Sequence, residues 1–178
     1  TNLDLIKIRG MQVKGMKVST LSMLYDKKTP LKDAIEHLYV QADQAHQDGA
    51  TILVLSDRGV DQEHMAIPSL LAVSALQQYL VKTRKNTAVS IIVETAEPCE
   101  VHHFATLLGF GASAVNPYLA LDTLYELIGT GVLDKDYSQA CKDYIHAVVS
   151  GIVKIASKMG ISTIQSYQGS KIFEALGI

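Results

Sequence analysis

The stretch Thr51-Ile52-Leu53-Val54-Leu55-Ser56-Asp57-Arg58-Gly59 decides the fold class. Its first five residues form an apolar run with the length of a buried strand, and the polar residues from Ser56 onward end that strand. After a loop, Pro68 precedes a segment in which apolar side chains recur at helical spacing, namely Leu70, Leu71, Ala75, Leu76 and Leu80. The stretch therefore predicts one unit of strand, loop and helix.

The same unit recurs on both sides of this stretch. Further strands are predicted over 18–24, 88–93 and 112–115, and further helices after Pro30, Pro98 and Pro117. All four prolines of the chain thus stand where a helix is expected to begin. Proline suits the first helical position because its missing N–H would have no partner there. Thr29 and Asn116 are expected to be N-cap residues.

The C-terminal part of the chain is predicted to contain one long helix from Tyr137 to Met159. A short strand over 162–164 and a helical turn or two over 170–176 are expected after it. The apolar stretch 145–161 contains Lys154 and Lys158 and is shorter than the roughly 20 residues that cross a bilayer. It is therefore expected to be a buried helix, and no membrane association is predicted.

Alternating strands and helices favour parallel pairing through right-handed crossovers. The pattern predicts an α/β fold of repeated β/α units with a mainly parallel sheet. Because a closed barrel of eight units needs about 250 residues, the fold is expected to be an open doubly wound sheet or an incomplete, degenerate TIM-barrel-like one. Residues 1–130 would hold the β/α units, and residues 131–178 would hold the long helix and the C-terminal segment, together as one folded unit.

Composition and charge narrow the function classes. Hydrophobic residues make up 48% of the chain and aromatic residues 6%, as expected for a parallel sheet buried on both faces. The net charge is −2 without a basic stripe, which argues against nucleic acid as a partner. Cys99 and Cys141 lack CxxC spacing and are interpreted as reduced thiols of a cytoplasmic protein. Because the chain starts at Thr1 without a methionine, we expect it to be part of a longer protein.

Ligands of parallel β/α folds gather at the C-terminal ends of the strands. The polar candidates there are Ser56, Asp57, Arg58, Glu94, Thr95, Asn116, Tyr118, Gln165 and Ser166. Asp57 and Arg58 could orient a polar substrate. Alternatively, Asp57 caps its loop and Arg58 forms a structural ion pair with a carboxylate such as Glu94, and we favour this second interpretation.

Other constellations do not complete a catalytic or metal site. Cys99, His102 and His103 near Glu94 could suggest a metal, but the adjacent histidines point in different directions and no further ligand has recognisable spacing. The glycines of 109–111 follow a predicted helix, whereas a dinucleotide fingerprint opens one. A hydrolase that uses Asp57 with His64, or Glu94 with His102, has no activated nucleophile to support it.

Taken as whole segments, the sequence closely resembles the central region of the glutamate synthase large subunit. The similar segments are 52–60, 67–74, 93–95, 100–105, 109–112, 115–120, 158–167 and 172–175. The resemblance runs from about Val18 to the last residue. It departs at Gln168, where the family is expected to have an arginine, and residues 137–156 are only loosely similar.

The resemblance implies a parent enzyme that converts glutamine, 2-oxoglutarate and a reductant into two molecules of glutamate. An N-terminal cysteine amidotransferase domain and an FMN barrel with a 3Fe–4S cluster would be the partners of this segment, with residues 131–178 leading toward the barrel. The chain itself would be the non-catalytic connecting domain, without catalytic, cofactor or metal residues.

Two further expectations accompany this interpretation. The alternative function is a free-standing β/α module that binds a small anion near Asp57, Glu94 and Asn116. An incomplete barrel-like sheet would expose apolar edges, so self-association of the isolated chain is expected.

Overall fold

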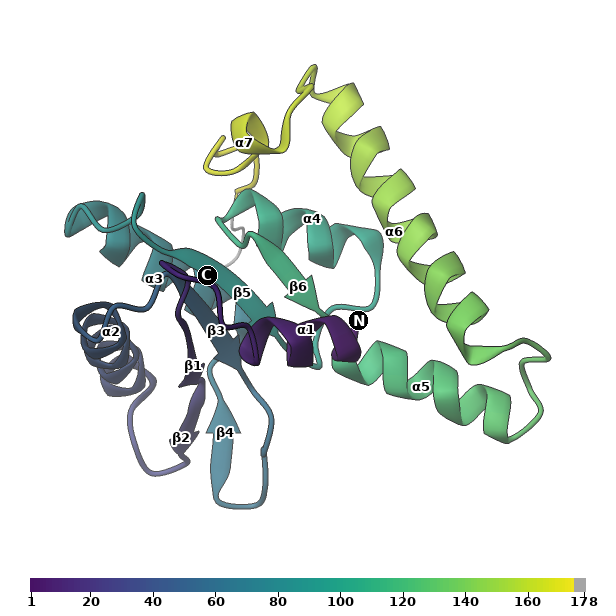
Figure 1. Ribbon diagram of the computed structural model, residues 1–178, viewed down its shortest axis with the longest axis horizontal. Coiled ribbons are helices and arrows are strands. Elements are labelled where there is room, and N and C mark those ends of the chain that lie inside the picture. Colours follow the sequence, from purple (N-terminus) through teal and green to yellow (C-terminus); the bar gives the residue numbers. More distant parts are fainter. Residues whose placement is uncertain (175–178) are drawn as a thin grey trace.

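The computed structural model describes residues 1–174 and consists of a parallel sheet with helices on both faces (Figure 1). The elements in chain order are α1 (Asn2–Arg9), β1 (Val18–Ser22), β2 (Leu24–Asp26), α2 (Leu31–Gln47), β3 (Ile52–Ser56), β4 (His64–Ala66), α3 (Ser69–Lys82), β5 (Ser90–Glu94), α4 (Val101–Gly109), β6 (Ala114–Asn116), α5 (Tyr118–Gly129), α6 (Tyr137–Lys158) and α7 (Ile164–Tyr167).

The strands β1, β3, β5 and β6 are parallel and lie side by side in chain order. The predicted mainly parallel α/β fold is thus confirmed. β2 and β4 form a separate antiparallel ribbon beside the C-terminal ends of β1 and β3. The predicted strand 18–24 is therefore two strands, separated by the buried Met23. The Met23 N–H donates to Ser56 O at 2.8 Å, and its carbonyl accepts from Ile67 N at 2.9 Å.

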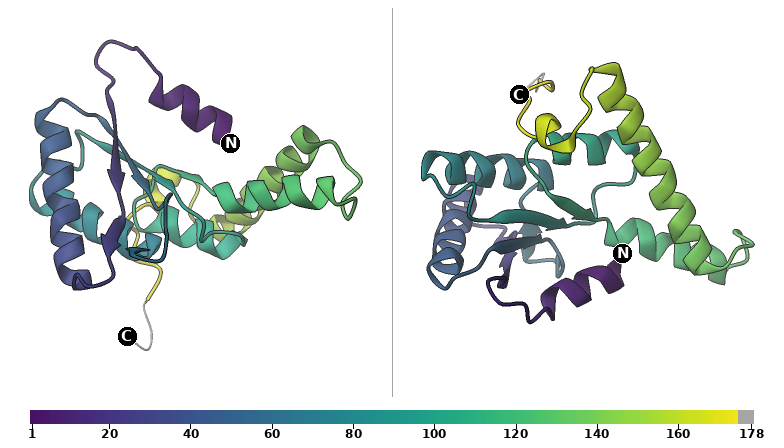
Figure 2. Two further views of the ribbon diagram at one scale, coloured as in Figure 1. Left: turned by 90° about the horizontal axis from the view of Figure 1, so that it is seen from below. Right: turned by 45° about the horizontal axis from the view of Figure 1, so that its top comes forward.

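The two faces of the sheet have different covers. On one face, Leu53, Leu55 and Val93 join apolar residues of α2, α3 and α4 in the main core. On the other face, Leu5 of α1 packs on Val54 and Ile92 in a much smaller cluster. Figure 2 (right) shows α1 on one side of the sheet and α3 and α4 on the other.

Three of the four prolines stand one position earlier relative to their helices than predicted. Pro30, Pro68 and Pro117 are the N-cap residues of α2, α3 and α5, and their carbonyls accept the first helical hydrogen bonds at 3.1, 2.9 and 3.2 Å. Thr29 and Asn116 therefore precede the caps, because the residue before a proline is driven out of helical geometry. Pro98 lies before the N-cap Glu100 of α4.

The C-terminal region differs from its prediction in three places. The long helix is confirmed as α6, but the expectation that residues 145–161 are buried is wrong, since Val148 is the one buried residue among them. Residues 162–164 form no strand: Thr163 caps the single turn α7, and its hydroxyl accepts from Ser166 N at 3.4 Å. Residues 170–174 have no regular structure, and the remainder of the predicted turn, 175–176, lies outside the described residues. None of the described helices is long and apolar enough to cross a membrane.

Candidate functional site: a polar row at the strand ends

A row of polar side chains crosses all four parallel strands at their C-terminal ends. The strand register aligns Ser22 with Ser56, Ser56 with Glu94, and Glu94 with Asn116. Because side chains alternate along a strand, the four belong to the sheet face that α1 covers. Ser56, Glu94 and Asn116 are buried. The structure therefore brings three of the predicted site residues together on neighbouring strands.

Glu94 is the centre of this row. Its carboxylate accepts hydrogen bonds from the Ser56 hydroxyl at 2.6 Å and from Arg58 Nε at 2.7 Å. Arg9 of α1 donates through Nη2 at 2.7 Å and through Nη1 at 3.4 Å, and its Nε reaches the Thr20 hydroxyl at 3.3 Å. The ion pair between Arg58 and Glu94, proposed from sequence as the structural interpretation, is present.

Two opposing effects set the pKa of Glu94. Burial raises the pKa of this carboxyl, since the charged form loses water, but hydrogen bonds from Arg9, Ser56 and Arg58 favour the charged form and outweigh burial. The net pKa is lower than the ordinary value of 4.5. Glu94 is thus an ionised hydrogen-bond acceptor at neutral pH and is unsuited to donate a proton.

Asp57 and its neighbours occupy the opposite side of the same strand ends. One oxygen of the Asp57 carboxylate accepts from the Thr95 hydroxyl at 2.6 Å and from Ala96 N at 2.9 Å, which ties the loop after β3 to the loop after β5. Burial, together with the adjacent Asp57 carboxylate, raises the pKa of Tyr118 to about 12. The Arg58 guanidinium stacks on the Tyr118 ring at 3.9 Å.

Helix α1 supplies the part of the cluster that sequence reasoning missed. Besides Arg9, its Asn2 accepts from Asn116 Nδ2 at 3.1 Å, so both ends of the helix are attached to the polar row. A usable signal was the Thr1-x-x-Asp4 pattern, which forms a capping box and marks a helix start. Nothing local to Arg9 indicated a partner 85 positions away.

Gln165 and Ser166 do not belong to the cluster. They were expected to follow a final strand, but they lie in α7, and the residues after them are bound at the other end of β6. Gly169 N donates to Gly109 O at 2.8 Å and Gln168 Nε2 to Ala112 O at 2.8 Å, both acceptors preceding β6. The segment therefore packs near the N-terminal end of the sheet.

The cysteine and histidine side chains form no metal centre within residues 1–174. His103 Nδ1 accepts from the backbone N–H of Cys99 at 3.3 Å and of Glu100 at 3.4 Å, so this ring caps the start of α4. His64, the exposed first residue of β4, pairs with Asp61 of the preceding loop at 2.9 Å. The hydrolase pairs Asp57 with His64 and Glu94 with His102 show no side-chain hydrogen bond among the described contacts.

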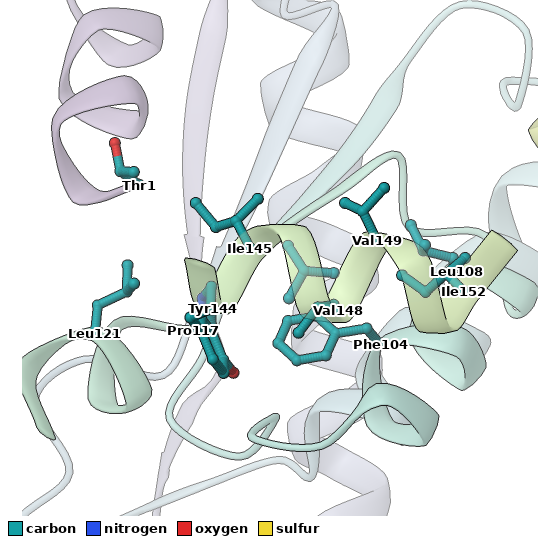
Figure 3. Close-up of a pocket in the computed structure, with 11 residues that line it drawn as sticks. Thr1, Phe104, Leu108, Pro117, Leu121, Tyr144, Ile145, Val148, Val149 and Ile152 are labelled. Carbon is teal, nitrogen blue, oxygen red and sulfur yellow. The ribbon is translucent and has the colours of Figure 1, made fainter. Parts of the chain in front are cut away.

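An apolar cleft of about 230 Å³ lies between α4, α5 and α6 (Figure 3). Its lining is aliphatic and aromatic except for Thr1, and it consists of Thr1, Phe104, Leu108, Val115, Pro117, Leu121, Tyr144, Ile145, Val148, Val149 and Ile152. The cleft has the character of a packing surface, since the lining carries no charged side chain.

Comparison with known proteins agrees with the resemblance. The family described as the glutamate synthase central domain matches residues 1–178. The large chain of the NADPH glutamate synthase of Bacillus subtilis is 49% identical over 148 residues, 83% of this chain and 10% of that protein. The NADH glutamate synthase of Schizosaccharomyces pombe is 44% identical over 147 residues, 82% of this chain and 7% of that protein.

A third relative, the ferredoxin-dependent glutamate synthase of Pyropia yezoensis, is 42% identical over 175 residues, 92% of this chain and 11% of that protein. The chain thus spans about a tenth of the length of the curated relatives that it matches. With its whole length covered by one family, the chain belongs to the glutamate synthase central domain family.

Proposed function

We propose that this chain is the non-catalytic connecting domain of a glutamate synthase large subunit. The parent enzyme would convert glutamine, 2-oxoglutarate and a reductant into two molecules of glutamate, and this segment would hold the glutaminase domain and the FMN barrel in position. The observation that carries the proposal is the use of Glu94: its buried carboxylate is occupied by Arg9, Arg58 and Ser56. The polar side chains at the strand ends are thus engaged in hydrogen bonds with one another and with α1.

The cofactors of the parent enzyme are proposed to lie in its other domains. An iron–sulfur cluster is held by several cysteine thiolates, whereas this chain has two cysteines, of which Cys99 is exposed and Cys141 is buried. The residues present therefore do not fit the 3Fe–4S cluster. The apolar cleft between α4, α5 and α6 offers no charged side chain as a partner for the FMN phosphate.

We further propose that the domain is a degenerate part of a TIM-barrel-like fold. Supporting this, the parallel strands follow one another in chain order, as in a barrel, whereas doubly wound sheets reverse their order. The face of Val54 and Ile92, which would be the barrel interior, is covered here by α1. Residues 1–130 and 131–178 are proposed to form one unit, supported by α6, which packs on α4 and α5.

The remaining proposals concern the setting of the domain. Relatives named for NADPH, NADH and ferredoxin all match this segment, so we propose that the electron donor is selected elsewhere in the parent protein. A cytoplasmic location is proposed from the reduced-thiol interpretation of Cys99 and Cys141. Self-association of the isolated chain is also proposed, and a monomeric mass by light scattering would contradict it.

A flavin titration tests the non-catalytic assignment. FMN is added to the purified 178-residue chain, and its fluorescence and absorbance are followed, with the full-length parent enzyme stripped of flavin as the positive control. We expect the parent to bind FMN stoichiometrically and the chain to leave the flavin spectrum unchanged. Tight, stoichiometric binding by the chain alone would contradict the proposal.

A further inference from the structure

Helix α6 is apolar over more of its circumference than its contacts in this domain require. Tyr144 and Val148 face α4 and α5, and Gly151 allows close approach to α4, since a Cβ there would lie 2.6 Å from the Val101 methyl groups. A surface helix of a globular protein needs one such apolar stripe. This stripe accounts for the packing of α6 within the domain.

A second apolar stripe lies beside the first and has no cover within residues 1–174. Ile145, Val149 and Val153, four residues apart, are 39%, 51% and 58% exposed. Residues at this spacing share one side of a helix. Ile145 and Val149 also line the apolar cleft (Figure 3), so the stripe adjoins the cleft through these two residues.

We propose that this stripe and cleft are the docking surface for an aliphatic segment from another part of the same parent polypeptide. The inference rests on the proposed function and assigns to one surface the contact with the rest of the enzyme. The length of the relatives supports this occupant, because about nine tenths of the Bacillus subtilis protein lies outside the matched segment.

Charge on the stripe further specifies the partner. Lys142 lies two turns before Val149 on the same side of α6, and the neighbouring Asp143 is already bound by Lys135 at 2.8 Å. Lys142 itself makes no ion pair within the described part of the chain. A second copy of the chain would present the same lysine. A segment that carries a carboxylate beside its aliphatic side chains would complement it.

Cysteine labelling in the full-length parent enzyme tests this proposal. A cysteine replaces Val149 in one variant and Ala147 in the control, because Ala147 is exposed on the opposite side of the same helix. The rate of modification by N-ethylmaleimide at each position is measured by peptide mass spectrometry. The same two variants are measured in the dilute, isolated 178-residue chain.

We expect Val149→Cys to react at least about tenfold more slowly in the parent than in the isolated chain, and Ala147→Cys to react at similar rates in both. Equal rates for Val149→Cys would overturn the proposal. Protection that rises with concentration of the isolated chain and is absent in the parent would assign the surface to a second copy instead. Should Val149→Cys fail to fold by circular dichroism, Ile145→Cys replaces it.

This test and the flavin titration can fail independently. Flavin binding by the chain would contradict its non-catalytic role but would leave the labelling pattern unchanged. Equal labelling rates for Val149→Cys in the parent enzyme and in the isolated chain would contradict the docking surface. They would leave the structural role of the polar cluster around Glu94 unaffected.

Discussion

The sheet face under α2, α3 and α4 differs from the face under α1 in what holds its cover in place. On the first face, long helices bury Leu53, Leu55 and many other apolar side chains in one continuous core. On the second, a helix of eight residues contributes Leu5 and is otherwise attached by Arg9 and Asn2. Hydrophobic burial dominates one side, and charged hydrogen bonds make up much of the other.

This contrast offers a reason for the polar side chains at the strand ends. The α1 face has too little apolar area to fix the helix, because Leu3 and Ile6 point outward and are 68% and 62% exposed. The buried Glu94 carboxylate holds the helix instead, because it accepts charge-assisted, directional hydrogen bonds from Arg9 of α1 and also from Arg58. The polar row is therefore explained by attachment of α1 and of the loop after β3.

The largest change in the free energy of unfolding is expected when a buried leucine is replaced by alanine on each face of the sheet. Leu53→Ala is expected to lower the free energy of unfolding by about 3 kcal/mol, since it leaves a cavity among fully buried side chains. Leu5→Ala is expected to cost about 1 kcal/mol, because α1 can shift or detach and so collapse the cavity. Urea unfolding followed by circular dichroism measures both. Equal losses would contradict the view that hydrophobic burial holds the helices on one face and hydrogen bonds hold α1 on the other.

A smaller effect is expected from Glu94→Gln. The substitution leaves Arg9 and Arg58 without their counter-charge, but the two side chains are 33% and 45% exposed and keep much of their hydration. We therefore expect a loss of about 2 kcal/mol, less than for a fully buried ion pair. Glu36→Gln is the matched control, since the Glu36 side chain is 63% exposed, and it should unfold like the unmodified chain. No loss in Glu94→Gln would contradict the role of the cluster.

The smallest effect is a difference in acid sensitivity. The folded pKa of Glu94 is below its ordinary value of 4.5, so its contribution to stability is present above that pH and is lost as the pH falls through the folded pKa. The chain should therefore lose stability below about pH 4.5 more steeply than Glu94→Gln does. Asp43, whose pKa is also lowered by Lys85 and Tyr79 against the effect of burial, titrates in both proteins and cancels from the comparison. Parallel pH profiles would contradict this assignment.

The part of the fold that could be predicted is the part under the large helices. Apolar runs such as 51–55 and the four prolines locate strands and helices locally, and neighbouring strands then pair in order. The strand expected at 162–164 was wrong, because Thr163 is the N-cap residue of the helical turn α7. A segment of three residues is too short for its pattern to separate a strand from a helical turn.

The sequence predicted which strand-end residues make up the candidate site, but it did not predict that Arg9 of α1 contacts them. Ser56, Asp57, Arg58, Glu94 and Asn116 do lie together, because parallel strands end at one edge of the sheet. Arg9 was missed because α1 has apolar residues on both sides, Leu5 inward and Ile6 outward, and so lacks a one-sided pattern. A contact over 85 positions depends on the folded arrangement.

Amide hydrogen exchange in the chain and in its Glu94→Gln variant tests the central claim most directly. If the carboxylate holds α1 on the sheet, the substitution should raise exchange in residues 2–9 by about tenfold or more while the amides of α2 and α3 change far less. Unchanged exchange in α1, or an equal increase throughout the sheet and helices, would contradict an attachment role for Glu94.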